Sequence, residues 1–450
     1  MSTHQNDRRT AGPFKVAMAS FIGTTIEYYD FFIYGTAAAL VFPRLFFPEA
    51  TPVMGTLLSF ATFGVGFLAR PLGGIVFGHF GDRIGRKKML IISLVGMGLA
   101  TMLMGLLPGY AQIGIAAPIL LTLLRLFQGF MVGGEWGGAT LMAVEHAPKG
   151  KRGFYGAFPQ TGAPAGTALA TVAFLSVSQL PDEAFFTWGW RLPFLVSAVL
   201  VVVGLIIRMA VSESPAFAAA RSKDAIVKLP IKEAFKRHPK EIFLIAGTYM
   251  SQGVYAYITM SYLVNYASKV VDLDKSTALM GVFIAAVIAT VLYPVFGALS
   301  DTYGRKTMYL IGVLAMGVVT WPAFMLINTG TAWGFTTAVV LLFGIAMPPA
   351  AGVTGSLMAM VFSREVRYTG ASVGYTLGTL AGPAFAPTIA TALFAAYGSS
   401  DAVAIYMIIV SVISVVSVSL LPGGWGRKEA LYNAESQDQA IEAKVKAAAN

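Results

Sequence analysis

Twelve long apolar segments, separated by short polar loops, dominate this 450-residue sequence. Each has roughly 20 residues or more, the length that a helix needs to cross the hydrocarbon core of a bilayer. They cover, to within a few residues, 14–40, 54–78, 89–108, 116–145, 154–178, 191–212, 240–267, 276–299, 307–327, 332–360, 369–397 and 401–422. Because a lipid-exposed open sheet cannot satisfy its backbone there, we expect an all-α membrane protein with twelve transmembrane helices.

The composition agrees with a membrane protein and excludes several classes of site. Charged residues make up 12% of the chain, against about 25% in soluble proteins, and the deficit falls in the apolar runs. The chain has no cysteine, which removes disulfides, thiolate metal sites and a cysteine nucleophile. The sequence has no nucleotide-binding loop, metal-ligand cluster or nucleophile triad, so we expect no enzyme activity, no metal and no cofactor.

Basic residues collect in alternate loops and predict the orientation. These loops contain Arg83 to Lys88, Lys149 to Arg152, Arg305 with Lys306, and Arg364 with Arg367. The positive-inside rule places them in the cytoplasm together with both termini. This pattern also accounts for the net charge of +10, so we expect no nucleic-acid partner. We interpret the polar start, with no cleavage site after a short apolar region, as an uncleaved first helix.

A long polar interval near the middle divides the chain into two similar parts. We predict a cytoplasmic N-terminal tail over 1–13, a six-helix bundle over 14–212, a cytoplasmic linker over 213–239, a second six-helix bundle over 240–422 and a cytoplasmic tail over 423–450. Internal duplication of this kind is common in secondary transporters.

A ten-residue motif recurs at equivalent places in the two parts. GHFGDRIGRK spans Gly78 to Lys87, and GALSDTYGRK spans Gly297 to Lys306. The glycines permit tight turns, the aspartates can cap a neighbouring helix, and the basic residues pair locally. We predict a conformational latch, although the loops could also serve topology alone. The residues assigned to it are Gly78, Asp82, Arg83, Gly85, Arg86, Glu145, Arg152, Asp301, Gly304, Arg305 and Arg367.

The repeated motif resembles the major facilitator superfamily, and other stretches resemble its metabolite:proton symporter family. Those stretches are EYYDFFIYG from Glu27, FLARPLGGIVFGHFGDRIGRKK from Phe67, RLFQGFMVGGEWGGA from Arg125, WGWRLPF from Trp188 and EVRYTG from Glu365. The resemblance implies two pseudo-symmetric bundles, alternating access, and proton-driven import of a metabolite such as shikimate, 2-oxoglutarate, citrate, proline or betaine. The chain departs from the family at two positions. Thr302 stands in the second motif where the first has Arg83, and Met360 stands where relatives commonly have glutamate. We therefore expect the latch of the second half to differ from that of the first.

Ionisable residues at membrane depth are confined to the first half of the chain. Such residues are costly in lipid and normally line a cavity. Proton coupling requires a carboxylate whose pKa can move toward neutrality, and the four histidines lie in tails, loops or helix ends. We therefore assign proton coupling to Glu27, Asp30 and Glu135, with permanent structural pairing as the alternative.

Guanidinium groups bind carboxylates through two parallel hydrogen bonds, so the arginines in the membrane spans predict an organic anion as substrate. We expect acidic and basic stripes of the first and fourth helices to face one water-filled cleft, with a neutral aromatic and amide wall from the second half. The candidate substrate contacts are Arg70, Arg125, Gln128, Arg191, Tyr249, Gln252, Tyr255 and Tyr375. For Arg191, anchoring at the membrane boundary is an equal alternative.

The sequence therefore predicts a monomeric symporter for protons and a small organic acid in a bacterial cytoplasmic membrane. A proline or betaine symporter and a proton-coupled drug or metabolite exporter remain as alternatives. Prolines at 159, 164, 348, 349, 383 and 387 predict bends in the fifth, tenth and eleventh helices that would help the halves to rock.

Overall fold

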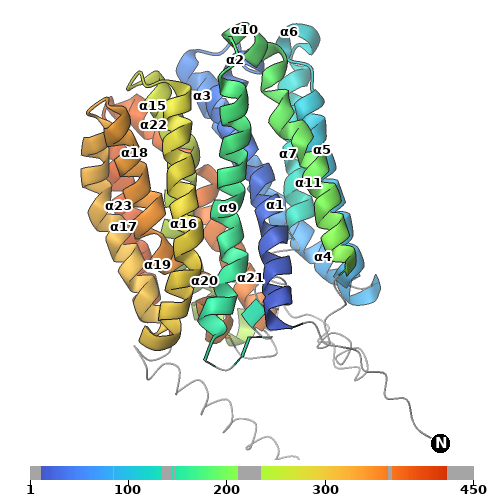
Figure 1. Ribbon diagram of the computed structural model, residues 1–450, viewed down its shortest axis with the longest axis vertical. Coiled ribbons are helices and arrows are strands. Elements are labelled where there is room, and N and C mark those ends of the chain that lie inside the picture. The colour runs from blue at the N-terminus through green and yellow to red at the C-terminus, as the bar shows by residue number, and fades with distance from the viewer. Residues whose placement is uncertain are drawn as a thin grey trace, which may run out of the picture.

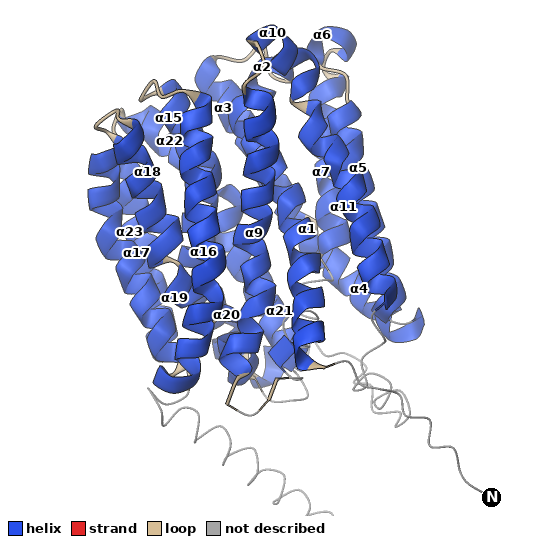
Figure 2. Ribbon diagram, in the orientation of Figure 1, coloured by secondary structure: helices blue, strands red, loops and turns tan. Residues whose placement is uncertain are grey.

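The computed structural model describes residues 12–84, 86–133, 143–144, 147–148, 150–210, 235–362 and 367–422. Within these ranges the elements are α-helices with short π- and 3-10 segments, as Figure 2 shows. The predicted all-α fold is confirmed.

The helices of the first half follow the predicted spans closely. They are α1 (Pro13–Leu40), α2 (Phe42–Leu45), α3 (Pro52–Leu68), α4 (Arg70–Ile84), α5 (Arg86–Leu106), α6 (Tyr110–Ile113), α7 (Ala116–Val132), α9 (Arg152–Ser178), α10 (Asp182–Ala184), η1 (Phe185–Gly189) and α11 (Arg191–Ala210). The second predicted span corresponds to α3 and α4, joined at Ala69, and the sixth corresponds to α11, which η1 precedes.

The second half contains more interruptions. Its elements are α14 (Pro239–Tyr257), η2 (Ile258–Tyr262), α15 (Leu263–Lys269), α16 (Lys275–Tyr303), α17 (Arg305–Ile327), α18 (Ala332–Val339), η3 (Val340–Ala346), α19 (Pro348–Ala351), α20 (Thr354–Val361), α21 (Arg367–Ala381), η4 (Pro383–Phe385), α22 (Ala386–Tyr397) and α23 (Asp401–Leu420).

The prolines act differently in the three spans where we expected bends. The tenth span breaks at Pro348 and the eleventh at Pro383, as expected for a residue that lacks a backbone donor. The fifth span does not break, because α9 continues as one helix through both Pro159 and Pro164.

Hydropathy distinguishes the first and seventh spans from the other ten. Among the described residues, eight helices are long and apolar enough to cross a membrane, and Ile91–Leu106 and Ala116–Val132 are shorter apolar helices. The first and seventh spans, α1 and α14 to α15, are not among these ten. They contain Glu27, Asp30 and Gln252, and α1 packs against η2 and α15 of the other half.

The two halves meet along their central helices. In Figure 1, α9 of the first half and α16 of the second run side by side through the middle of the molecule, and α9 also packs along α1. The lower end carries the start of α9 and the turn at Gly304, and we call it the basic-loop end. The upper end, with α2, α6 and α10, is called the opposite end.

Candidate substrate and proton-coupling site

Asp30 lies fully buried at the centre of the first half. The Ser197 hydroxyl on α11 donates to Asp30 Oδ1 at 2.5 Å, and the Thr101 hydroxyl on α5 lies 3.1 Å from Asp30 Oδ2. Thr101 has a second acceptor, the Met97 carbonyl oxygen, at 3.0 Å. Because one hydroxyl proton serves two acceptors, Thr101 can turn away from Asp30 without losing its hydrogen bond.

A chain of hydrogen bonds connects Asp30 to Arg125. Gln128 Nε2 donates to Thr101 Oγ1 at 2.8 Å, and Arg125 Nη1 donates to Gln128 Oε1. Arg125 and Gln128 are both fully buried on α7. The carboxylate and the guanidinium are therefore joined through two neutral side chains, and the structure gives this described pair no direct ion pair.

Aromatic rings surround both membrane arginines. The Arg125 guanidinium lies over the rings of Phe31, Tyr34 and Phe63 at 4.5, 4.3 and 4.8 Å, and Arg70 lies over Phe31 and Phe67 at 4.3 and 4.5 Å. Cation–π contacts of this kind stabilise a buried guanidinium. Within the described part of the chain, Arg125 Nη2 and Arg70 Nε have no hydrogen-bond partner. Each arginine therefore keeps donor capacity for another group.

A small cavity lies between the halves. Its volume is about 20 Å³, enough for about one water molecule. The lining comes from both halves: Tyr28, Phe32, Gln160 and Ala163 from the first, and Tyr249, Gln252, Ala256, Tyr257, Met260, Tyr293, Phe343 and Met347 from the second. None of these side chains is charged. Tyr249 and Gln252 of the predicted neutral wall are among them, but the lining from the first half is neutral too.

Three tyrosine hydroxyls meet beside the cavity. Tyr249 OH lies 3.2 Å from Tyr375 OH, which lies 3.4 Å from Tyr28 OH, and the rings of Tyr249 and Tyr375 are 4.4 Å apart. Tyr28 belongs to α1 of the first half and the other two belong to the second half. The cluster thus connects the halves at the centre.

An aromatic layer separates the arginines from the cavity. Tyr257 lines the cavity, and its ring packs on Phe63 at 5.3 Å and on Phe67 at 5.5 Å. These two phenylalanines also contact Arg125 and Arg70. Tyr257 and these two phenylalanines therefore form a chain of contacts from the cavity to the two guanidinium groups.

The predicted water-filled cleft is absent from the arrangement of the described residues. Asp30, on α1, is linked to Gln128 and Arg125, on α7, through Thr101 on α5, and the cavity lining contains none of them. Hydrogen bonds from neighbouring hydroxyl and amide groups take the place of water around these buried charges. Glu27 is also buried on α1, at 4% exposure, whereas Glu135 lies outside the described residues.

Two predicted substrate contacts lie elsewhere. Arg191 Nη1 donates to the carbonyl oxygens of Gly105, in the last turn of α5, and Leu107, just beyond it, both at 2.7 Å. Tyr255 OH lies 2.5 Å from Thr320 Oγ1 and 3.0 Å from Ser411 Oγ, inside the second half. Both residues are hydrogen-bonded within their own half, away from the cavity lining.

The structure adds four residues that the sequence did not single out. Thr101 and Ser197 hold Asp30, and Gln160 and Tyr293 line the cavity. Small hydroxyl residues in apolar helices usually bond to their own backbone, so no pattern singled out Thr101 and Ser197. Gln160 is the one amide in the fifth predicted span and Tyr293 the one tyrosine in the eighth, and that isolation was a usable signal.

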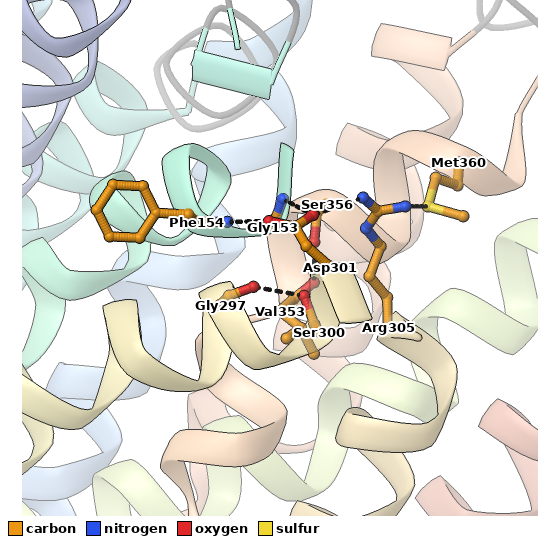
Figure 3. Close-up of polar contacts among 9 residues, drawn as sticks. All are labelled: Gly153, Phe154, Gly297, Ser300, Asp301, Arg305, Val353, Ser356 and Met360. Atoms are coloured by element: carbon orange, nitrogen blue, oxygen red, sulfur yellow. Dashed lines mark hydrogen bonds and ion pairs between the residues drawn. The ribbon is translucent and has the colours of Figure 1, made fainter. Parts of the chain in front are cut away.

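At the basic-loop end, Asp301 joins the two halves. Its Oδ1 accepts from the Gly153 N–H at 2.7 Å and its Oδ2 from the Phe154 N–H at 3.0 Å (Figure 3). These N–H groups belong to the first turn of α9, where backbone donors lack helical partners and the dipole favours an anion. The contact is close, because a Cβ on Gly153 would lie 2.3 Å from the Gly297 carbonyl oxygen.

Arg305 supports Asp301 from within the second half. Its Nη2 pairs with Asp301 Oδ1 at 3.0 Å, and its Nη1 lies 3.0 Å from the sulfur of Met360, as Figure 3 shows. A thioether is only a weak acceptor. Gly304, between α16 and α17, has φ of +91°, a conformation that favours glycine.

The other latch residues can be placed only in part. Arg152 is exposed at the start of α9. Gly85 and Glu145 lie outside the described residues, and the structure describes no side-chain detail at Gly78, Asp82, Arg83, Arg86 and Arg367.

The halves also touch at the opposite end. Asn265 Nδ2 donates to the Ala39 carbonyl oxygen at 2.8 Å, Lys269 Nζ donates to Thr56 Oγ1 at 3.1 Å, and Lys275 pairs with Asp182 at 3.1 Å. Described residues therefore join the halves near both ends of the molecule. No group of three acidic or histidine side chains among them could hold a metal ion.

Comparisons with known proteins agree with this architecture. The "Sugar (and other) transporter" family profile matches residues 15–228, and the "Major Facilitator Superfamily" profile matches residues 272–439. The chain is 42% identical over 417 residues to the inner membrane metabolite transport protein YhjE of Escherichia coli, covering 90% of this chain and 93% of the relative. It is 40% identical over 411 residues to the shikimate transporter of the same organism, covering 90% and 94%.

A solved structure with the same fold is that of the D-xylose-proton symporter, with a TM-score of 0.69 and 18% identity, covering 90% of this chain and 96% of that one. At this identity the likeness concerns the fold alone. The sequence relatives, which align over nearly the whole chain, establish the family. This chain is a membrane transporter, not an enzyme, and it belongs to the major facilitator superfamily, within the family of metabolite transporters identified from its motifs.

Proposed function

We propose that this chain is a proton-coupled symporter that imports a small organic acid, shikimate-like or a di- or tricarboxylate, by alternating access. It would act as a monomer in the bacterial cytoplasmic membrane, with both termini in the cytoplasm. The proton gradient would supply the energy, and no cofactor would be needed.

The observation that carries the proposal is the environment of Asp30. Ser197 and Thr101 contact its two carboxyl oxygens, and hydroxyl groups both donate and accept hydrogen bonds. They can therefore hold Asp30 either as a carboxylate or as a neutral acid. A carboxyl group that is buried in both forms without a direct cation partner is suited to take up and release a proton.

The link to Arg125 supports coupling between proton and substrate. Gln128 and Thr101 connect the two ionisable groups, so a change at Asp30 alters the hydrogen bonds available to Arg125. Arg125 Nη2 and Arg70 Nε can each donate to a substrate carboxylate once the aromatic layer of Phe63, Phe67 and Tyr257 moves.

Alternating access is supported by contacts between the halves at both ends. Asp301 contacts the start of α9 at the basic-loop end, and Asn265 contacts Ala39 at the opposite end. In alternating access, one set must break while the other remains.

The decisive test is uptake into proteoliposomes with an imposed pH gradient. The panel contains shikimate, 2-oxoglutarate, citrate, aromatic acids, proline and betaine. Accumulation of one organic acid only when the outside is more acidic supports the proposal. Accumulation of proline or betaine alone would favour the osmolyte alternative, and proton-opposed export of a toxic compound would favour the exporter. Accumulation of an acid that ignores the gradient would refute proton coupling.

A further inference from the structure

Two buried side chains on the cavity wall have polar atoms without a hydrogen-bond partner. They are Nε2 of Gln160, on α9, and the hydroxyl of Tyr293, on α16, and the residues are 5% and 1% exposed. Both line the same cavity, one from each half, and α9 packs along α16. The cavity therefore brings two free donors together across the interface between the halves.

The interior gives other buried tyrosines a partner. Tyr309 OH donates to the Thr248 carbonyl oxygen at 2.8 Å, and Tyr29 OH donates to the Pro193 carbonyl oxygen at 2.7 Å. The Tyr262 hydroxyl also has no partner, but Tyr262 does not line this cavity. An unpaired buried polar atom is costly, so its presence on the wall of a cavity needs an explanation.

The chemistry of the wall indicates what would pair with these atoms. A glutamine NH2 group only donates, whereas a tyrosine hydroxyl both donates and accepts. A ligand hydroxyl can accept from Gln160 and donate to Tyr293 at the same time. No cavity-lining side chain is charged, and the volume of about 20 Å³ suits one small uncharged oxygen-bearing group.

We propose that Gln160 and Tyr293 form a subsite for an uncharged hydroxyl group of the transported carboxylate, so that the chain selects hydroxylated carboxylates over their deoxy analogues. This inference rests on the proposed transport function and narrows its substrate class. The rings of Tyr28, Phe32 and Tyr257 would pack on the carbon skeleton. Because one ligand hydroxyl bridges α9 and α16, its binding also favours closure of the halves around it.

Three matched ligand pairs test the subsite. The pairs are shikimate with cyclohexene-1-carboxylate, citrate with tricarballylate, and 4-hydroxyproline with proline. Each pair differs in ring or chain hydroxyl groups and keeps its carboxylates. Binding is measured on the purified full-length protein by calorimetry, and by the shift in melting temperature that a bound ligand produces.

Tyr293→Phe and Gln160→Met remove the two polar groups with little change of volume. For whichever pair binds, we expect the wild type to prefer the hydroxylated member. Each variant should reduce its affinity about 3- to 10-fold and leave the deoxy member unchanged. Without ligand, Tyr293→Phe should melt at or above the wild-type temperature, because it deletes an unpaired buried hydroxyl. Tyr309→Phe, which removes a paired hydroxyl, should melt lower and keep the hydroxyl preference.

The subsite is wrong if the wild type shows no hydroxyl preference, if the variants weaken both members of a pair equally, or if no member of any pair binds. Failure of the transport proposal is a different result. The wild type could prefer the hydroxylated ligand and yet show no proton-driven uptake in proteoliposomes. That result would support the subsite and refute proton coupling. If the protein prefers 4-hydroxyproline to proline and shows no preference in the other pairs, the subsite is supported but the chain is an osmolyte carrier.

Discussion

The carboxylate of Asp301, in the second half of the chain, accepts a 2.7 Å hydrogen bond from the backbone N–H of Gly153, in the first. With the bond from Phe154, it joins the halves through the first turn of α9. Both bonds cross the interface, so both must break whenever the halves separate at the basic-loop end. The strength of this contact should therefore set how often that end opens.

Asp301→Asn should open the basic-loop end. The substitution removes the negative charge and leaves one oxygen for two N–H donors, which we expect to cost about 2 kcal/mol of closed-state stability, or about 30-fold in the ratio of closed to open forms. The chain has no cysteine, so a single Ala163→Cys in the cavity lining reports access. Maleimide should label it faster in Asp301→Asn membranes when added from the side of the basic-loop end, which we propose faces the cytoplasm. An unchanged labelling rate would contradict a latch role for Asp301.

Met360→Glu should have the opposite effect. A carboxylate in place of the thioether would give Arg305 Nη1 a charged acceptor and hold Arg305 in position against Asp301. We expect slower labelling of Ala163→Cys and slower uptake, by several-fold. Met360→Gln supplies a neutral acceptor, so its labelling and uptake rates should lie between those of the wild type and Met360→Glu. Faster labelling in Met360→Glu would show that the added carboxylate draws Arg305 away from Asp301.

Breaking the Lys275–Asp182 ion pair at the opposite end should affect transport much less than breaking the Asp301 contact. Lys275 and Asp182 are 31% and 72% exposed, and an exposed pair contributes about 0.2–1 kcal/mol. Asp182→Asn should therefore change the initial uptake rate by less than about fivefold, with a smaller effect at high salt. If Asp182→Asn disturbs transport as strongly as Asp301→Asn, our ranking of the two contacts is wrong.

Asp30→Asn should separate exchange from accumulation. Asparagine can still bond to Ser197 and Thr101, so the fold should survive, but it cannot carry a proton. We expect uphill accumulation to disappear while counterflow of labelled substrate continues. Glu27→Gln is the companion variant, and the same result is expected if Glu27 shares the proton. Accumulation that persists in both variants would refute the assignment to α1.

Arg125→Ala should weaken substrate binding itself. It removes the donor at Nη2, deprives Gln128 Oε1 of its partner and exposes the packing of Phe31, Tyr34 and Phe63. We expect at least a tenfold loss of affinity together with a lower melting temperature. Arg125→Lys keeps the charge without the planar fork, so it should recover stability more fully than affinity. If Arg125→Ala binds substrate with wild-type affinity, residues other than Arg125 bind the substrate carboxylate.

Much of the fold could be predicted from length and hydropathy, because a bilayer fixes the length of a spanning helix. The predicted span 276–299 lies within α16 (Lys275–Tyr303), and 401–422 matches α23 (Asp401–Leu420) within two residues. The π-helices η2 and η3 were not predicted, because an extra residue per turn leaves no hydrophobic pattern of its own. α9 continues as one helix through Pro159 and Pro164, so the fifth span has no break of the kind seen at Pro348 and Pro383.

The candidate site could be predicted less completely. Spacing on α1 and α7 identified Asp30, Arg125 and Gln128, because charge in an apolar segment is conspicuous. It could not show that α5 and α11 supply hydroxyls to Asp30, since Thr101 and Ser197 are ordinary residues of apolar helices. Asp301 was predicted to cap a neighbouring helix, but only the packing of α16 on α9 identifies which helix it caps.

The small central cavity means that the space for a substrate has to be created by movement. Contacts near both ends join the halves around a volume of about 20 Å³, far less than a metabolite occupies. Helices of the two halves must therefore shift before a metabolite can be accommodated. Binding and the change of shape are then one event rather than two successive steps.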